Sequence, residues 1–306
     1  CDMLIEIPKT PVQELFDPLF DQKKIRVLIK REDQNDPLIM GNKYRKLKYN
    51  LYEAEKIGAD TLLTYGGAFS NHIAATAAAG KKYGFKTIGL IRGEELTKTS
   101  NNTLKNASDL GMKLIFLPRP DYQEMKNSLT YPKDLESNLF VIPEGGTNGA
   151  AIKGCAELIS EIDCSYDILC TPVGTGGTLA GLLKGLQGTK NVWGFSALKG
   201  DWIHSSIAKL LELEKVTAPN YQLFTDERFG GYGKYNESLL QFIKQFVETK
   251  YIPLEPIYTG KMCFLLWEMI KNDEIAAGLT LLLLHTGGLQ GTIGFNQKYS
   301  QHLPVL

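Results

Sequence analysis

A lysine at the start of a predicted helix is the residue of this chain best placed for covalent chemistry. Lys43 follows a Gly-Asn turn in segment 41–51, where apolar residues recur at helical spacing and predict a helix over residues 43–57. The positive end of the helix dipole and the neighbouring cations disfavour the ammonium form of a first-turn lysine. A neutral amine can form a Schiff base with an aldehyde. Taken alone, the segment is more typical of a solvated basic face, and we expect Lys46 and Lys48 to lie on the helix surface.

A second segment that could take part in binding or catalysis is the glycine-rich turn at 173–181, which follows an apolar strand and begins a helix. Its glycine amides, two hydroxyls and helix N-terminus are suited to a phosphate group, and they come from Thr175, Gly176, Gly177 and Thr178. Leu179 stands at the third glycine position of a GxGxxG motif, and no Gly-Lys-Ser/Thr follows. The spacing therefore excludes a dinucleotide fingerprint and a nucleotide P-loop. A tight turn without a ligand is the simpler alternative, and we favour a monophosphate site over it.

A similar turn at 65–72 ends another predicted strand and contains Ser70, Asn71 and His72. Ser70 and Asn71 are good N-cap residues for the alanine-rich helix that follows, and that structural role alone accounts for them. In a functional role, the free amides of the helix would accept a substrate carboxylate, while Ser70 offers a hydroxyl and Asn71 an amide to a ring oxygen. His72 is more typical of a packed helix residue than of a base.

Three further glycine-rich turns lie in the second half of the chain. They contain Tyr232, Tyr258 and Thr286, and in most proteins such turns only connect secondary-structure elements. Combined with a helix-start lysine and a phosphate cradle, however, they describe a site for a cofactor that carries both an aldehyde and a phosphate. Pyridoxal 5'-phosphate is such a cofactor.

The composition narrows the class of protein. The 306 residues contain 34 basic and 34 acidic side chains, so no long-range field favours nucleic acid or an anionic membrane. Five scattered cysteines without a CxxC pair are typical of reduced thiols in a cytoplasmic protein, and four separated histidines give no metal-ligand spacing. The start of the chain resembles no signal peptide, and because it begins at Cys1 we expect a few native residues to precede it. The strongest apolar run, at 279–284, is too short to cross a bilayer.

The elements that must position these residues alternate between apolar strands and helices. The expected strands are 25–29, 61–64, 87–91, 113–117, 139–142, 167–173, 192–197 and 280–284, and alanine- and glycine-rich helices are expected at 73–83 and 179–186. Continuous apolar strands separated by helices predict an α/β protein with open, mainly parallel sheets. We expect two domains with a ligand cleft between them. Residues 1–46 and 151–306 would form a larger cofactor-binding domain, and residues 47–150 a smaller one.

The chain resembles a fold type II pyridoxal-phosphate enzyme, similar to tryptophan synthase β, of the group containing D-cysteine desulfhydrase and 1-aminocyclopropane-1-carboxylate deaminase. The segments that carry this resemblance occur in the family's order at 41–47, 66–72, 143–148, 174–181, 231–237, 258–262 and 285–289. The resemblance implies that Lys43 holds the cofactor covalently. It also implies a role for each of the other turns: Asn71 at the ring hydroxyl, Thr175, Gly176, Gly177 and Thr178 at the phosphate, Thr286 near the pyridine nitrogen, Ser70, Asn71 and His72 at the substrate, and Tyr232 and Tyr258 on the reacting side.

One position separates the two activities of this group. The deaminase has a glutamate after the tyrosine that corresponds to Tyr258, and this chain has Thr259. A neutral partner leaves the pyridine nitrogen less charged and the cofactor a weaker electron sink, which suits loss of a β-thiol better than opening of a cyclopropane ring. The triplet 70–72 also resembles the desulfhydrase, whereas Ala68 and Phe69 match neither pattern. We therefore expect D-cysteine desulfhydrase activity, with the deaminase as the alternative and a non-catalytic relative as an alternative of another class. A D-amino-acid substrate and a homodimer follow from the resemblance alone.

Overall fold

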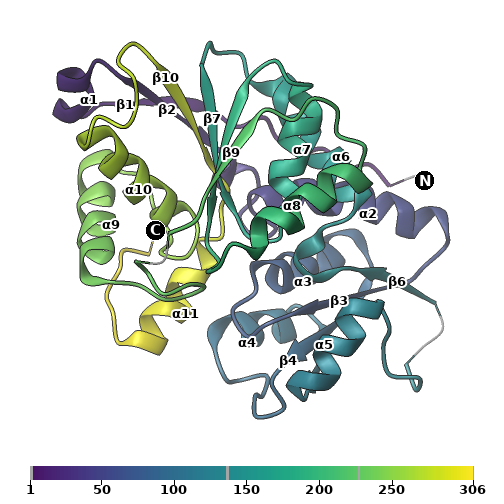
Figure 1. The fold of residues 1–306 in the computed structure, drawn as a ribbon. Helices are drawn as coiled ribbons and strands as arrows, with labels where there is room; N and C mark the ends of the chain where they lie inside the picture. Colours follow the sequence, from purple (N-terminus) through teal and green to yellow (C-terminus); the bar gives the residue numbers. More distant parts are fainter. Residues whose placement is uncertain (1–2, 136–137, 227, 306) are drawn as a thin grey trace.

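The computed structural model describes residues 3–135, 138–226 and 228–305, and it contains two separate sheets (Figure 1). The larger sheet has the strand order β1-β2-β10-β7-β8-β9 and the smaller one β5-β4-β3-β6. The strands are β1 (Val12–Leu15), β2 (Arg26–Arg31), β3 (Thr61–Gly66), β4 (Lys86–Arg92), β5 (Met112–Leu117), β6 (Leu139–Ile142), β7 (Ile168–Val173), β8 (Asn191–Ser196), β9 (Tyr221–Phe224) and β10 (Thr280–His285). All pairings are parallel except that of β1 with β2. The predicted α/β class with two open, mainly parallel sheets is confirmed.

All eight predicted strands are present, and two further strands were missed. The missed strands are β1 and β9, which form the two edges of the larger sheet. Each has four residues, and most of their side chains are partly or fully exposed. Short edge strands lack the continuous apolar run by which the central strands were identified, which explains the omission.

Helices separate the strands. They are α1 (Pro18–Lys23), α2 (Asn42–Lys56), α3 (Asn71–Tyr83), α4 (Asn102–Asp109), α5 (Arg119–Ser128), α6 (Gly149–Ala156), α7 (Gly177–Leu186), α8 (Trp202–Leu213), α9 (Glu237–Lys250), α10 (Thr259–Lys271) and α11 (Gln290–Tyr299). The three helices predicted from sequence correspond to α2, α3 and α7, with ends that differ by at most two residues. Among the residues that the structure describes, no helix is both long and apolar enough to span a bilayer.

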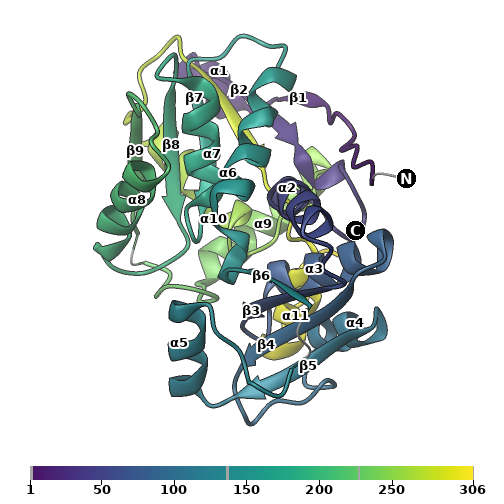
Figure 2. The same ribbon diagram turned by 90° about the vertical axis from the view of Figure 1, so that its right-hand side faces the viewer.

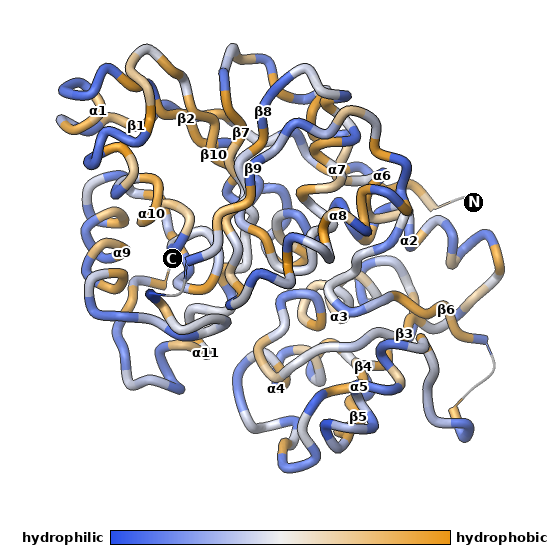
Figure 3. Tube along the Cα trace, in the orientation of Figure 1, coloured by the Kyte–Doolittle hydropathy of each residue, from blue (hydrophilic) through white to orange (hydrophobic). Residues whose placement is uncertain are grey.

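Both faces of the larger sheet are buried. Leu281 and Leu283 of β10 pack in a core with α9 and α10, whereas Leu282 and Leu284 pack in another with α7 and α8. Successive strand residues point to opposite faces, so this alternation of apolar partners requires helices on both sides. The central strands β2, β10 and β7 accordingly contain runs of hydrophobic residues (Figure 3).

The strands of the smaller sheet all fall between residues 61 and 142, and those of the larger sheet fall outside this range. Packing crosses the predicted domain boundaries, however. Helix α11 from the end of the chain contacts α4, and the two lie next to each other at the smaller sheet (Figure 2). Near the start of the chain, Ile5 packs in one core with Leu47 and Leu51 of α2. The domain boundaries at 46/47 and 150/151 stay a prediction.

Candidate active site

Lys43 lies where the start of α2 meets the end of β10. Gly41 caps this helix with a positive φ of 72°, and a Cβ there would come within 1.9 Å of the carbonyl oxygen of Thr286. The same carbonyl accepts a hydrogen bond of 3.2 Å from the backbone N–H of Asn42. Only glycine permits this approach. The Gly-Asn turn therefore fixes the first turn of α2, with its lysine, against the segment that contains Thr286.

The side chain of Lys43 is directed to the interior of the molecule. Its Nζ donates a hydrogen bond of 3.2 Å to the carbonyl oxygen of Gly145, in the loop that follows β6. Burial, together with the positive charge of nearby Lys46, holds the pKa of Lys43 well below its ordinary value of 10.5. Both causes disfavour the ammonium form. This environment favours the neutral amine that covalent chemistry requires.

Lys46 is not a surface residue, and the sequence-based prediction for it was wrong. Only 2% of the residue is exposed, and its Nζ donates to Gly145 O at 3.0 Å, Thr147 Oγ1 at 3.2 Å and Thr175 Oγ1 at 3.4 Å. Residues three apart on a helix share a face, so Lys46 points in the same direction as Lys43. That spacing was the available signal in the sequence.

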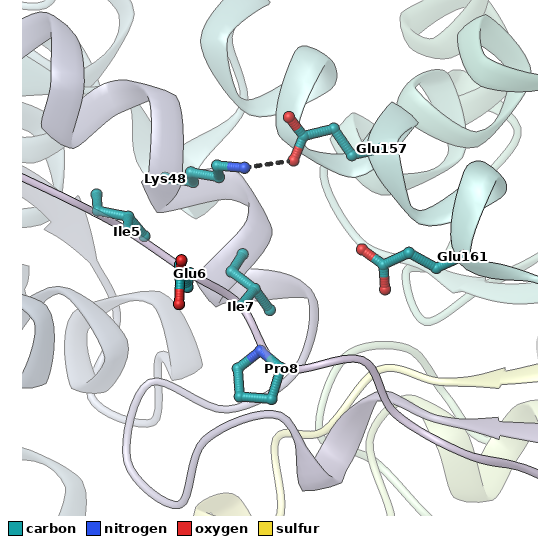
Figure 4. Close-up of a pocket in the computed structure, with 7 residues that line it drawn as sticks. All are labelled: Ile5, Glu6, Ile7, Pro8, Lys48, Glu157 and Glu161. Atoms are coloured by element: carbon teal, nitrogen blue, oxygen red, sulfur yellow. Dashed lines mark hydrogen bonds and ion pairs between the residues drawn. The ribbon is translucent and has the colours of Figure 1, made fainter.

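Lys48, by contrast, lines a groove on another part of the surface. This groove, between the N-terminal segment and α2, is lined by Ile5, Glu6, Ile7, Pro8, Lys48, Glu157 and Glu161 (Figure 4). The ammonium group of Lys48 forms an ion pair of 2.7 Å with Glu157 in this groove. None of the predicted site residues lines it.

The turn after β7 contains the residues predicted to bind a phosphate, and we call it the cradle. Gly176 has a φ of 90°, and Gly177 begins α7. A Cβ on Gly177 would come within 2.7 Å of Thr147 Oγ1 and 3.0 Å of the Nζ of Lys46. The hydroxyl of Thr178 accepts a hydrogen bond of 2.8 Å from the side-chain amide of Asn42, which ties the cradle to the helix that carries Lys43.

The cradle fits an anion. Glycine at its centre leaves room for a group to approach the backbone, and the N-terminus of α7 contributes a positive dipole end. The hydroxyls of Thr147 and Thr175 bond to one another, and the buried ammonium of Lys46 donates to both. A phosphate would match this set of donors.

The turn after β3 places all three of its predicted residues at the start of α3. Ser70 caps this helix, and its hydroxyl accepts a hydrogen bond of 3.2 Å from the backbone N–H of Ile73. The side-chain oxygen of Asn71 accepts one of 2.6 Å from Gln290. A Cβ on Gly288 would lie 2.6 Å from Asn71 Nδ2, so this turn abuts the segment after β10. The predicted functional residues from both sheets are thus brought together.

His72 is buried beneath this turn, with 1% of its surface exposed. Its Nε2 lies 2.8 Å from the hydroxyl of Thr64, and its Nδ1 is buried without a hydrogen-bond partner among the described residues. Burial and the charges of Lys43 and Lys46 hold the pKa of His72 well below its ordinary value. The ring is therefore neutral, and its contact with substrate stays a prediction.

The two predicted tyrosines lie together. The rings of Tyr232 and Tyr258 are 6.0 Å apart between centroids and inclined at 65°. A Cβ on Gly174 would come within 3.2 Å of the Tyr258 ring, which places this ring beside the phosphate cradle. Burial and the neighbouring Tyr232 raise the pKa of Tyr258 well above its ordinary value. Tyr258 therefore remains protonated at neutral pH and can donate a proton.

Two buried charges that the sequence analysis missed hold the tyrosines in place. The Glu255 carboxylate accepts hydrogen bonds from the backbone N–H groups of Ile257, Tyr258 and Thr259. Lys261 donates 2.9 Å to the carbonyl oxygen of Gly231, the residue before Tyr232. Glu255 is 1% and Lys261 4% exposed. Lys261 acts on a backbone group that only folding brings close, so no sequence motif could have indicated it. Glu255 instead bonds to backbone N–H groups two to four residues further on, just before and at the start of α10.

Thr259 also bears on the fit of a cofactor. It is fully buried, and its hydroxyl has no hydrogen-bond partner among the described residues. A buried hydroxyl without a partner is costly unless a ligand satisfies it. With an amine of lowered pKa at Lys43 and donors suited to an anion at the start of α7, the site has a group for each polar end of pyridoxal phosphate.

Comparison with known proteins identifies the family. The family described as "Pyridoxal-phosphate dependent enzyme" matches residues 4–287. Two curated relatives bear the name "Putative 1-aminocyclopropane-1-carboxylate deaminase". The one from Pyrococcus horikoshii is 31% identical over 89% of this chain and 87% of its own length. The one from Thermotoga maritima is 29% identical over 96% and 98%.

A solved structure titled "Crystal Structure Analysis of the ACC deaminase homologue" superimposes with a TM-score of 0.81 at 28% identity, and the match covers 95% of this chain and 93% of that one. The predicted tryptophan synthase β-like fold, the cofactor and the class of enzyme are confirmed. The chain belongs to the pyridoxal-phosphate-dependent enzymes and, within them, to the group of 1-aminocyclopropane-1-carboxylate deaminase and D-cysteine desulfhydrase.

Proposed function

We propose that this enzyme eliminates the β-substituent of a small amino acid and that its preferred reaction is the conversion of D-cysteine and water to pyruvate, ammonia and hydrogen sulfide. The observation that carries this proposal is Thr259. Its buried hydroxyl has no protein partner among the described residues and is electrically neutral, so it does not support a positive charge on the pyridine nitrogen. Loss of a β-thiol needs a weaker electron sink than cyclopropane opening.

Bound pyridoxal phosphate supplies the electron sink at the substrate Cα. The roles of the protein's own groups follow from their positions. The neutral amine of Lys43 can accept the Cα proton, and the protonated phenol of Tyr258, or Tyr232 beside it, can donate a proton to the leaving sulfur. The amides at the start of α3, with Ser70, can bind the substrate carboxylate.

In this proposal, separate protein groups bind the phosphate and the ring of the cofactor. The residues at the phosphate are Thr175, Gly176, Gly177 and Thr178, joined by Lys46. Asn71 would face the ring hydroxyl, and Thr286 would lie near the pyridine nitrogen together with Thr259. His72 would pack beneath the turn that carries Ser70 and Asn71 and hold it in place.

The deaminase reaction, which converts 1-aminocyclopropane-1-carboxylate to 2-oxobutyrate and ammonia, is the alternative that the names of the curated relatives favour. The decisive assay measures pyruvate and 2-oxobutyrate from D-cysteine, β-chloro-D-alanine, D-serine, L-cysteine and the cyclopropane substrate. Lys43→Ala provides the background. We expect pyruvate from D-cysteine and β-chloro-D-alanine to dominate. Efficient 2-oxobutyrate formation would overturn the weight placed on Thr259.

A non-catalytic relative that binds pyridoxal phosphate or an amino acid is the alternative of another class. It predicts a protein that binds the cofactor and forms neither keto acid from any of these substrates. A homodimer and a cytoplasmic location complete the proposal, the first from the family resemblance and the second from the scattered cysteines. Light scattering during size-exclusion chromatography tests the dimer, and a mass of a single chain would contradict it.

A further inference from the structure

Arg92 lies at the substrate side of the site, although no sequence motif drew attention to it. It is the last residue of β4, and in the parallel pairing of β3 with β4 its neighbour Ile91 is opposite Gly66. A Cβ on Gly67 would lie 3.5 Å from a guanidinium nitrogen of Arg92. Arg92 therefore stands beside the loop that leads to Ser70, at the carboxyl edge of the sheet where ligands of such folds bind.

The guanidinium of Arg92 has no protein anion to balance it. Its side chain is exposed, and no hydrogen bond or ion pair joins it to any residue that the structure describes. Two carboxylates of this region, Glu144 and Glu95, are already paired. Glu144 accepts from Tyr122 and from Lys126, the latter at 2.8 Å, and Glu95 pairs with Arg119 at 2.6 Å.

The charge of Arg92 acts on Tyr232, one of the two tyrosines predicted to line the reacting side of the site. Burial raises the pKa of Tyr122 and of Tyr232, and the positive charge of Arg92 opposes that rise at both phenols. Tyr122 belongs to α5 beside the smaller sheet, whereas Tyr232 lies in the loop before α9 and contacts Tyr258. The positive charge of Arg92 thus acts on both phenols.

We propose that Arg92 binds a negative charge on the side chain of the substrate, so that this enzyme also accepts, beside D-cysteine, small amino acids with an anionic side chain or β-substituent. The proposal rests on the proposed function, since it concerns the same substrate site. The α-carboxylate is left to the start of α3, where Ser70 caps the helix. An anion one or two atoms beyond Cβ would meet the unpaired guanidinium, for which a bidentate contact is the favoured geometry.

Serine O-sulfate illustrates the chemistry for this class. The Cα–H and Cβ–O bonds break, Lys43 accepts the proton, and sulfate leaves with the electron pair of the Cβ–O bond while a Cα–Cβ double bond forms. One water then replaces the amino nitrogen at Cα, and ammonia is released. The products are pyruvate, ammonia and sulfate, with no oxidant or reductant. Arg92 would hold the sulfate group before and during its departure.

The first test measures binding without turnover. Aspartate and asparagine have nearly the same shape and differ in side-chain charge, and neither carries a good leaving group. Their dissociation constants, for both enantiomers, are measured on the holoenzyme by calorimetry. We expect one enantiomer of aspartate to bind about ten- to a hundredfold more tightly than the same enantiomer of asparagine, as for a charge-assisted hydrogen bond.

Three variants identify the source of that preference. Arg92→Met should bring the ratio of the two dissociation constants close to one, and Arg92→Lys should restore part of it. Arg119→Met, which removes a paired arginine from the same part of the smaller domain, should leave the ratio as in wild type. A wild-type ratio near one, or an equal weakening of both ligands in Arg92→Met, would overturn the proposal, because the second result would assign Arg92 to the α-carboxylate.

A second test uses turnover and separates this proposal from the proposed function. The ratio of kcat/KM for serine O-sulfate to that for β-chloroalanine should fall about tenfold or more in Arg92→Met, mainly through KM. Elimination products without an Arg92-dependent preference refute the anion site alone. An Arg92-dependent preference for aspartate without any elimination product refutes the proposed function and supports the anion site.

Discussion

The phosphate side and the substrate side of the site differ in how far the protein satisfies its own polar groups. On the phosphate side, Lys46 is 2% and Thr178 6% exposed, and each is hydrogen-bonded to other protein groups. On the substrate side, Arg92 is exposed and has no partner among the described residues. A cofactor that stays bound suits a preformed, buried site, whereas a substrate that enters and leaves needs groups that remain free to meet it.

The largest effect should come from the residue that joins the two sides. Lys43→Ala removes both the covalent attachment point and the amine that would accept the Cα proton, so we expect kcat to fall by at least about 10²–10⁴-fold. Keto-acid formation from β-chloro-D-alanine measures the loss. Lys48→Ala, which removes a cation from another face of α2, is the control and should retain activity. Turnover by Lys43→Ala at the wild-type rate would show that another group does this chemistry.

The phosphate side should respond next most strongly. Lys46→Met keeps the length of the buried side chain and removes its charge and donors, so the dissociation constant for pyridoxal phosphate should rise about ten- to a hundredfold. Titration of the apoprotein, followed by cofactor absorbance, measures it. Lys48→Met again serves as control. An unchanged affinity would mean that the glycine cradle binds the phosphate without Lys46.

The buried amine of Lys43 should also make the stability of the apoprotein depend on pH. Because burial lowers its pKa below 10.5, the unfolded chain binds more protons than the folded one between the two pKa values. This contribution is fully present above pH 10.5 and is lost as the pH falls towards the folded-state pKa. Lys43→Met should therefore gain free energy of unfolding over wild type at pH 7, and the gain should shrink towards pH 10.

Urea denaturation of the two apoproteins across this pH range tests that expectation. The reference variant is Lys48→Met, because the side chain of Lys48 is partly exposed. A difference between Lys43→Met and wild type that does not vary with pH would contradict a lowered pKa.

The smallest effect should appear on the substrate side. Ser70→Ala removes one hydroxyl near the substrate carboxylate and one helix cap, so KM should rise about three- to tenfold and the free energy of unfolding should fall by about 1 kcal/mol. Asn236→Ala removes the equivalent cap of α9, where the side chain accepts from Leu239 at 2.9 Å. It should lower stability by a similar amount and leave KM unchanged. Equal KM values for Ser70→Ala and wild type would reduce Ser70 to a structural role.

The sequence predicted features that are local along the chain. The Gly-Asn turn before Lys43, the glycine-rich turn at Gly176 and the central strands all have patterns that require no knowledge of distant partners. The cap at Ser70 was predicted for the same reason.

Features that depend on tertiary packing were missed. Lys46 looked like a surface lysine because the loop that buries it, around Gly145, lies about a hundred residues away in the chain. Arg92 immediately followed a predicted strand and acquired meaning only when β4 was found beside β3. The contact of Lys261 is with the backbone of Gly231, thirty residues earlier in the chain, and carries no sequence signature.

The most direct test of the whole account is to find which lysine carries the cofactor. Lys43 and Lys46 lie three residues apart on one helix face, and both donate to Gly145 O. Borohydride reduction of the holoenzyme fixes the cofactor to its lysine, and peptide mapping by mass spectrometry locates it. We predict the phosphopyridoxyl group on Lys43, with Lys46 unmodified. A modified Lys46, or a holoenzyme without a covalent adduct, would contradict the assignment of the two lysines to chemistry and phosphate binding.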